Sequence, residues 1–231
     1  MSNFNIETTS YENWKKAQEE ELRCWSNEPY DFDDWNSWWA LKFDNYEFLD
    51  NEKKIDSIYE VGCGPYAKNI EYVMKKLGYI PGRVLLEDPL LNSYVTLNKS
   101  VKRFQNIQNS YFISEPMESF SLQNAGIEPV DLLICNNVLD HVRSVELCFD
   151  HIDSSLNKDG IFIFGQDLTS EEDVISHGDE VDVCHPIRLD EASLEKYLEK
   201  YSIILKKILP RNEGRNPSHH YATLIFVGRK K

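Results

Sequence analysis

A glycine-rich turn that follows an acid is the first feature of this sequence that could bind a small molecule. The string Tyr-Glu-Val-Gly-Cys-Gly-Pro spans residues 59–65, so Glu60 stands two residues before Gly62 and four before Gly64. Glycines at the end of a strand let the backbone approach a ligand closely, and the helix that follows presents free N–H groups. The string also fits the pattern G-x-G-x-x-G/A, which is weak evidence alone. The carboxylate indicates a cationic ligand group rather than a pyrophosphate.

A pair of acids, Glu87 and Asp88, could hold a ribose. Asp88 lies 26 residues after Gly62 and is followed by a proline that ends the preceding apolar run. An acid at the end of the second strand of an α/β domain is placed to accept hydrogen bonds from two ribose hydroxyls. We therefore expect Asp88 to bind such hydroxyls, with Glu87 as the alternative.

A histidine and an aspartate could handle a proton at the same edge of the fold. His141 comes shortly after the apolar run at residues 131–136, and Asp167 comes just after the run at residues 161–165. Histidine titrates near neutral pH and can accept a proton and release it afterwards. We predict that His141 is the general base and that Asp167 orients it or shares the hydroxyl from which the proton is taken. The competing interpretation of His141 is a helix-capping histidine.

Other polar residues leave two alternatives open at this edge. His185 could reach the site from the segment that follows the fifth predicted strand. A metal site would use Asp167, Asp140 and His185, because carboxylates and imidazoles bind divalent cations. We predict no metal, and we regard Asp140 as structural.

These residues need a scaffold in which strands and helices alternate. Short apolar runs that are covered on both faces are typical of the strands of a parallel sheet. Such runs, each followed by a helical or turn pattern, predict a doubly wound α/β domain. The expected strands are 57–62, 83–88, 110–114, 131–136 and 161–165, and the expected helices are 67–77, 90–104 and 145–156, the last ending ahead of a turn at 158–160.

The last third of the chain predicts a different arrangement. Residues 169–181 are polar and acidic and indicate a surface excursion. Residues 190–201 predict a helix with Asp190 as its N-cap. Residues 202–209 and 221–228 are strand-like, and the loop between them predicts an antiparallel hairpin at one edge of the sheet.

The first 54 residues differ from the rest in their aromatic content. All five tryptophans (Trp14, Trp25, Trp35, Trp38 and Trp39) lie in the first 39 residues, and residues 11–23 have helical spacing. Indole faces beside Asp and Asn side chains commonly hold sugar rings, although packing against the main domain competes with this interpretation. We predict that residues 1–54 form a helical cap on a domain at 55–231, that residues 11–48 cover the carboxyl ends of the strands, and that Trp38 and Trp39 contact the substrate.

Composition excludes several classes of protein. The chain has 231 residues, 41% of them apolar, which suits one domain with an extension. Its net charge of −14 disfavours nucleic-acid binding, since phosphate backbones repel a negative surface. We see neither a transmembrane run nor a signal peptide. The five cysteines form no Cys-x-x-Cys pair, so we expect a reducing compartment and a cytoplasmic location.

Four successive motifs together resemble those of class I S-adenosylmethionine-dependent methyltransferases. They are Glu-Val-Gly-Cys-Gly at 60–64, Asp-Pro-Leu at 88–90, Ser-Glu at 114–115 and Asn-Asn-Val-Leu-Asp-His-Val at 136–142. The resemblance covers residues 55–168 well and the remainder in outline. It implies a Rossmann-like sheet of seven strands whose last hairpin is antiparallel.

The resemblance also implies roles for individual residues around S-adenosylmethionine. Glu60, Gly62 and Gly64 would surround its methionine part, Asp88 would hold the ribose, Ser114 and Glu115 would lie against the adenine, and Asn136 would contact the amino group through its carbonyl. Two positions depart from the family. Tyr66 replaces a glycine and could narrow the pocket, and Ile113 replaces an acid that would recognise adenine.

The pair His141 and Asp167 resembles metal-independent sugar O-methyltransferases. We therefore predict methyl transfer to a sugar hydroxyl of a glycan or deoxyhexose, with a small-molecule or glycan acceptor as the partner. A different small-molecule hydroxyl or an amine is the runner-up, since an amine needs no base. A cofactor-binding scaffold without activity and a nicotinamide-dependent oxidoreductase are alternatives of other classes.

Overall fold

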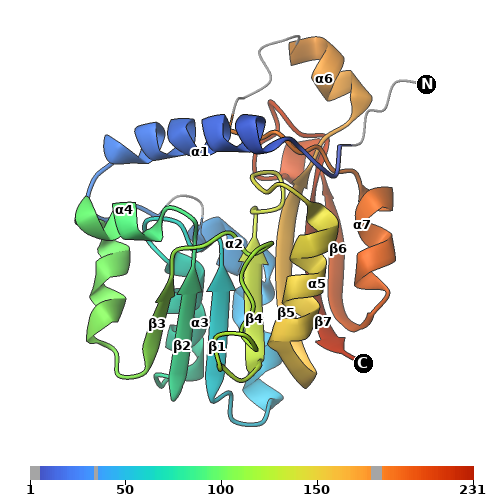
Figure 1. Ribbon diagram of the computed structural model, residues 1–231. Helices are drawn as coiled ribbons and strands as arrows, with labels where there is room; N and C mark the ends of the chain where they lie inside the picture. The colour runs from blue at the N-terminus through green and yellow to red at the C-terminus, as the bar shows by residue number, and fades with distance from the viewer. Residues whose placement is uncertain (1–5, 34–35, 178–183) are drawn as a thin grey trace.

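The computed structural model describes residues 6–33, 36–177 and 184–231. Within them the strands form one seven-stranded sheet in the order β3-β2-β1-β4-β5-β7-β6 (Figure 1). β1 to β5 are parallel, and β7 runs antiparallel between β5 and β6. The strands are β1 Ser57–Val61, β2 Arg83–Glu87, β3 Ser110–Ile113, β4 Val130–Asn136, β5 Leu156–Leu168, β6 Tyr201–Pro210 and β7 Ala222–Lys230. The predicted fold class, including the C-terminal hairpin, is confirmed.

Helices cover both faces of the sheet. α5 and α7 pack on one face, and α2, α3 and the 3-10 helix η1 pack on the other (Figure 1). The helices are α1 Tyr11–Ser26, α2 Asn36–Lys42, η1 Asp44–Asn51, α3 Lys68–Leu77, α4 Leu91–Thr96, η2 Ser100–Asn106, α5 Val145–Ser155, α6 Glu171–His177, α7 Glu191–Leu198 and η3 Arg211–Glu213.

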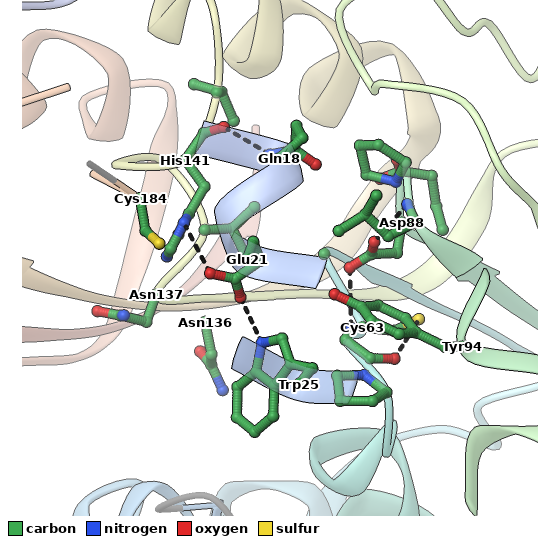
Figure 2. Close-up of a pocket in the computed structure, with 18 of the residues that line it drawn as sticks. Gln18, Glu21, Trp25, Cys63, Asp88, Tyr94, Asn136, Asn137, His141 and Cys184 are labelled. Carbon is green, nitrogen blue, oxygen red and sulfur yellow. Dashed lines mark hydrogen bonds and ion pairs between the residues drawn. The ribbon is translucent and has the colours of Figure 1, made fainter. Parts of the chain in front are cut away.

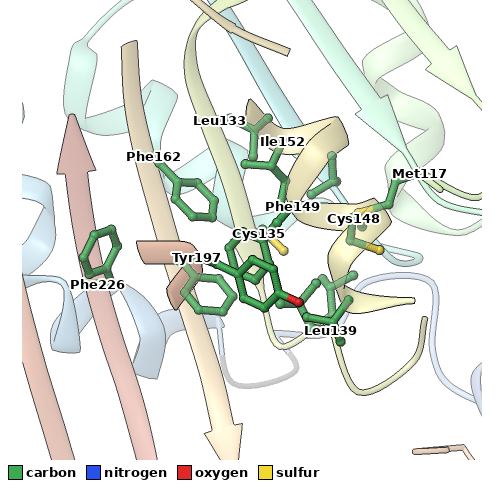
Figure 3. Close-up of a cluster of buried hydrophobic side chains, with 14 of the residues drawn as sticks. Met117, Leu133, Cys135, Leu139, Cys148, Phe149, Ile152, Phe162, Tyr197 and Phe226 are labelled. Atoms are coloured by element: carbon green, nitrogen blue, oxygen red, sulfur yellow. The ribbon is translucent and has the colours of Figure 1, made fainter. Parts of the chain in front are cut away.

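The apolar strands supply both cores because their side chains alternate between the two faces. On β5, for example, Phe162 belongs to the core beneath α5 and α7, and Ile163 belongs to the core beneath α2 and α3. Phe149 of α5 stacks on Tyr197 of α7 with ring centroids 4.3 Å apart, beside Phe162 (Figure 3). These contacts hold the sheet rigid, so the loops at its edge start from fixed positions.

Several predicted elements have different bounds in the structure: the strand expected at 161–165 spans Leu156–Leu168, and the helix expected at 190–201 ends at Leu198. The helix expected over 90–104 is interrupted between α4 and η2, where Asn98 has a left-handed φ of 57°. Asparagine tolerates that conformation, which a helix does not contain. The turn expected at 158–160 lies instead inside β5, where the pairing with β4 shifts register.

Asp190 is the N-cap of α7, as predicted, and its Oδ1 accepts a hydrogen bond from the Ser193 N–H at 2.8 Å.

The aromatic N-terminal segment goes to two places. α1 lies across the end of the sheet near the loops that follow β1 and β4 (Figure 1), whereas α2 and η1 pack beside α3 on a face of the sheet. Of the described part of the segment predicted to cover the strand ends, α1 lies across those ends, and α2 reaches the cavity there through Asn36 and Trp39. Trp35 lies outside the described residues, as do residues 178–181 of the predicted surface excursion, which otherwise contains α6. The boundary at residue 54 stays a prediction.

Among residues 6–33, 36–177 and 184–231, none forms a helix that is both long enough and apolar enough to span a lipid bilayer.

Candidate active site

A cavity of about 380 Å³ opens at the carboxyl ends of β1, β2 and β4. Its walls include the loops at residues 62–66, 87–90 and 136–138, together with side chains of α1. In a doubly wound sheet, ligands bind at this edge, where neighbouring crossovers leave a crevice. The predicted location of the site therefore coincides with the cavity.

The loop after β1 has the backbone conformation that its glycines permit. Gly62 and Gly64 have φ angles of 59° and 60°, in the left-handed region that favours glycine. A Cβ atom at Gly62 would meet Cγ2 of Val138 at 2.4 Å, so this position admits no side chain. A Cβ at Gly64 would meet no atom within 4 Å. Tyr66, which stands where the family commonly has a glycine, lines the cavity and donates its hydroxyl hydrogen to the Pro29 carbonyl at 3.1 Å.

The two acids at the end of β2 both line the cavity. Asp88 is held by the backbone: Oδ2 accepts from the Gly64 N–H at 3.0 Å, and Oδ1 accepts from the Leu90 N–H at 2.8 Å. Burial raises the pKa of Asp88 to about 7, although these two hydrogen bonds oppose the rise. Burial also raises the pKa of Glu87 well above its usual range, and neither of its carboxyl oxygens has a hydrogen-bond partner among the described residues.

Glu60 acts behind the cavity wall rather than on it. Its carboxylate accepts from Asn69 Nδ2 and from the Ile70 N–H, each at 2.9 Å, and burial raises its pKa to about 7. Asn69 Oδ1 in turn accepts from Asn136 Nδ2 at 3.1 Å. This chain fixes the orientation of the Asn136 amide and leaves its Oδ1 buried with no partner within the described part of the chain. Asn136 lines the cavity, so Glu60 positions a hydrogen-bond acceptor there indirectly.

The residues predicted to lie against adenine are not on the wall that the structure gives the cavity. Ser114 Oγ donates to the Pro89 carbonyl and accepts from the Asn92 N–H, both at 3.2 Å, and Glu115 is exposed. Ser114 therefore joins the loop after β3 to the loop after β2. Met117 and Glu118, three residues further on, line the cavity in their place.

His141 lies on the cavity wall with Asp140 and His185 around it. His141 Nε2 is 3.7 Å from Asp140 Oδ1, and His185 Nε2 is 3.8 Å from Asp140 Oδ2. The centroids of the two imidazole rings are 4.3 Å apart. Burial by itself would raise the pKa of Asp140, but the imidazoles of His141, His185 and His220, together with the side chain of Gln166, outweigh it and hold that pKa below its usual value. Asp140, expected to be structural, is thus the acid beside His141.

The predicted partnership between His141 and Asp167 is not formed. Oδ1 of Asp167 accepts from the Thr223 hydroxyl and Oδ2 accepts from Arg215 Nε, both at 2.7 Å. Asp167 is 2% exposed, and the pocket wall carries Arg215 rather than Asp167. Its carboxylate is therefore committed to an ion pair with a residue of the β6–β7 connection, a partner 48 positions away in the sequence.

The tryptophans on the wall are mostly not the ones predicted. Trp39 reaches the cavity but is 2% exposed, and it packs on Gly165, where a Cβ would meet its Cζ3 at 2.3 Å. Trp38 packs edge-on against Trp39, on the side of α2, and is not part of the described cavity wall. Trp14 and Trp25 of α1 do line the cavity.

α1 supplies a stripe of residues that the sequence interpretation missed. Trp14, Gln18, Glu21 and Trp25 recur every three or four positions and face the cavity. Gln18 Nε2 donates to the His141 carbonyl at 3.4 Å, and Glu21 accepts from Trp25 Nε1 and lies 3.9 Å from His141 Nδ1 (Figure 2). The helical spacing was visible in the sequence, but polar residues in it gave no signal that the stripe faced a ligand cavity.

Comparisons with known proteins find solved methyltransferases that share this fold. No family model and no curated protein matches the chain. Among solved structures, the N-methyltransferase NodS from Bradyrhizobium japonicum WM9 matches with a TM-score of 0.55 and 13% identity over 94% of this chain and 97% of its own. Coclaurine N-methyltransferase bound to N-methylheliamine and S-adenosylhomocysteine gives 0.60 and 12% over 83% and 72%.

A third structure is the 1,6-didemethyltoxoflavin-N1-methyltransferase of Burkholderia thailandensis, with 1,6-didemethyltoxoflavin and S-adenosylhomocysteine bound. It matches with a TM-score of 0.56 and 14% identity over 96% of this chain and 89% of its own. At such identities the likeness concerns the fold, which is the Rossmann-like fold of these methyltransferases.

Proposed function

We propose that the protein is an S-adenosylmethionine-dependent methyltransferase that acts on a small molecule. The observation that carries the proposal is the meeting of Asp88 and Asn136 in one cavity beside Gly64. Asp88 offers carboxylate oxygens for a ribose, and Asn136 offers an oriented amide oxygen for an ammonium group. The methyltransferase fold of the solved structures supports the same conclusion.

The cavity offers groups that suit several parts of S-adenosylmethionine. Gly62 and Gly64 leave room beside the backbone for the methionine part, and Asn136 Oδ1 is the acceptor for its amino group. Asp88, with Glu87 next to it, would hold the ribose hydroxyls. Asn136 Oδ1 and the Glu87 carboxyl oxygens have no hydrogen-bond partner among the described residues, and the Asp88 carboxylate can accept further hydrogen bonds. A bound ligand would pair these buried atoms, which are costly to leave unpaired.

The reaction needs little covalent chemistry from the protein. When bound, S-adenosylmethionine supplies a methyl group on a sulfonium sulfur, and that sulfur keeps the bonding electrons as S-adenosylhomocysteine when an acceptor lone pair takes the methyl. α1 closes the cavity and excludes water, and its side chains orient the acceptor. We propose that His141, on the wall between α1 and β4, handles the proton that a hydroxyl acceptor must lose.

A sugar hydroxyl is our first candidate for the acceptor, and the residues of α1 on the cavity wall support it. The indoles of Trp14 and Trp25 offer apolar faces, and Gln18 and Glu21 between them offer hydrogen-bonding groups. Such alternation suits a ring with C–H faces and hydroxyl edges. Trp38 and Asp167, on which the prediction from the sequence partly rested, do not contribute to this wall.

An amine is the second candidate, and the charge of the wall favours it. Glu20, Glu21 and Glu118 all line the cavity, and carboxylates beside indole rings stabilise a bound cation. Two of the solved structures with this fold are N-methyltransferases of small molecules by name. Methyl-transfer assays with a panel of sugars and a panel of amines separate the candidates, because turnover should be confined to one panel.

The proposed function is tested by calorimetric titration with S-adenosylhomocysteine and, separately, with NAD. We expect S-adenosylhomocysteine to bind and NAD not to. Asp88→Ala should weaken binding by about 1–3 kcal/mol, the contribution of one or two hydrogen bonds to a charged group. Unchanged affinity for S-adenosylhomocysteine in both Asp88→Ala and Glu87→Ala would refute the assignment of the ribose site.

A further inference from the structure

Three side chains on the acceptor side of the cavity have the donor set of a metal site. Asp140, His141 and His185 each offer one ligand atom, and these atoms all lie within 4.8 Å of one another. Two imidazoles and one carboxylate form the ligand set of many catalytic zinc sites, in which the fourth position stays open. His141 and His185 both line the cavity, so an open position would face it.

The acid at the centre of this group is buried in a way that indicates a missing partner. Asp140 is 5% exposed, and its Oδ1 has no hydrogen-bond donor among the residues that the structure describes. Both imidazole Nε2 atoms face its carboxylate, at 3.7 and 3.8 Å, which is too long for hydrogen bonds. Nitrogen and oxygen atoms at such separations can converge on one ion.

The backbone holds the three residues in place before any ion binds. The His141 N–H donates to the Val138 carbonyl at 3.0 Å, which closes the turn after β4. The Ile187 N–H donates to the Asp140 carbonyl at 3.2 Å and so brings the segment of His185 against the same turn. Main-chain segments that are fixed in this way lose little freedom when their side chains bind a metal.

An outer carboxylate lies beside the group, at a distance longer than a hydrogen bond. Glu21 Oε2 of α1 lies 3.9 Å from His141 Nδ1, the nitrogen on the far side of the ring from Asp140 (Figure 2). Histidines that bind metals commonly direct their second nitrogen to a carboxylate, which fixes the tautomer. The position of Glu21 therefore suits a His141 that binds through Nε2.

We propose that Asp140, His141 and His185 bind a zinc-type divalent cation whose open coordination position faces the acceptor. The role of the ion in methyl transfer rests on the proposed function, and it makes His141 a ligand rather than a free base. A hydroxyl bound at the open position loses its proton to solvent at lower pH. The oxygen lone pair then bonds to the methyl carbon as the carbon–sulfur bond breaks.

The test is calorimetric titration of the metal-stripped full chain with Zn²⁺. We expect one saturable site per chain in the wild type. Asp140→Asn and His185→Gln should each weaken it by more than the roughly 10- to 100-fold that loss of an outer carboxylate costs, and Glu21→Gln should fall within that range. His219→Gln, which changes an exposed histidine of the β6–β7 connection, is the matched control and should bind like the wild type.

The fold of each variant is checked by its thermal unfolding, and the same samples are titrated with S-adenosylhomocysteine. Wild type that binds S-adenosylhomocysteine but no Zn²⁺, or Zn²⁺ affinity equal in folded Asp140→Asn, His185→Gln and wild type, would overturn the metal site and leave the proposed function standing. Zn²⁺ bound through these residues without S-adenosylhomocysteine binding would support the site and refute the proposed function.

Discussion

The two halves of the cavity differ in what holds them in place. On the side that we propose for the cofactor, backbone groups dominate: Gly62 and Gly64 are in left-handed conformations, and Asp88 is held by two backbone N–H groups. On the acceptor side, side chains from distant segments meet, with Glu21 of α1 and His185 both directed to the turn that carries His141.

This difference means that the sheet determines one half of the cavity, whereas elements outside the sheet determine the other. The parallel sheet fixes where β1, β2 and β4 end, and the loops that leave it have few ways to continue. The acceptor side depends on which residues α1 and the segment before α7 present, and these elements are not part of the sheet. We expect substitutions on the two sides to separate cofactor binding from turnover.

His141→Ala should have the largest effect and should sharpen the comparison. Turnover should fall by about 10²–10⁴-fold, since His141 promotes loss of the acceptor proton either as the base or as a ligand of the proposed cation, and loss of a general base costs that much. Affinity for S-adenosylhomocysteine should stay nearly unchanged, because His141 lies on the acceptor side. Steady-state assays and calorimetry measure the two quantities, with His219→Ala as the control. Equal losses in both would contradict a division of the cavity into two sides.

Asp167→Asn should act on stability rather than on catalysis. The residue forms a buried ion pair with Arg215, and breaking such a pair costs about 3 kcal/mol of unfolding free energy. Urea denaturation measures the loss. Asp56→Asn is the comparison, because Asp56 pairs with Lys54 in an exposed position and its loss should change stability by about 0.5 kcal/mol or less. A stable Asp167→Asn that has lost its activity would instead return Asp167 to the catalytic machinery.

Trp14→Ala and Trp38→Ala form a matched pair of indole deletions. Trp14 lines the cavity, so its loss should raise the KM for the acceptor. The rise should correspond to the free energy of an aromatic contact, about 0.5–1.5 kcal/mol. Trp38 packs beside Trp39 and Lys42 on α2, and its loss should leave that KM unchanged. If the KM changes only in Trp38→Ala, the acceptor does not bind beneath α1.

The pH dependence of cofactor binding should be the smallest effect. Burial raises the pKa of Asp88 to about 7, and an ionised Asp88 accepts ribose hydrogen bonds better than a protonated one. Affinity for S-adenosylhomocysteine should therefore rise with pH up to about 7 and level off above it. Asp88→Asn should flatten that part of the profile, and an unchanged profile would assign the titration to another group, such as Glu60.

The raised carboxyl pKa values also set the sign of a stability change. Between about pH 4 and 7 the unfolded chain has lost the protons that Asp88 and Glu60 keep in the folded protein. The free energy of unfolding attributable to them should fall as pH rises through this window and stay constant above it. Urea denaturation of the wild type and of Glu60→Gln at a series of pH values measures this contribution.

Much of the fold could be predicted from the sequence because its signals are local. Buried apolar runs and the turns between them identify the strands. The proline after Asp88 marks the end of the second strand, so the position of this acid on the cavity wall could be predicted. The break at Asn98 was missed because a left-handed asparagine inside a helical pattern leaves no mark in composition.

The acceptor side could not be predicted from the sequence, because its polar side chains pair with residues that are distant in the sequence. No sequence pattern near Asp167 indicates that Arg215 and Thr223 donate hydrogen bonds to its carboxylate. The same holds for Glu60, whose effect on the cavity passes through Asn69 to Asn136. The outcome of such competition between polar groups depends on the folded arrangement as a whole.

Calorimetric titration of two glycine variants with S-adenosylhomocysteine tests the central claim most directly. Gly64 and Gly78 both have left-handed φ angles, 60° and 74°, and a Cβ at either would meet no atom within 4 Å. Valine at either position costs comparable backbone strain, but only Gly64 lines the cavity. We predict that Gly64→Val loses detectable binding and that folded Gly78→Val binds like the wild type. Unimpaired binding in a folded Gly64→Val would contradict the placement of the cofactor in this cavity.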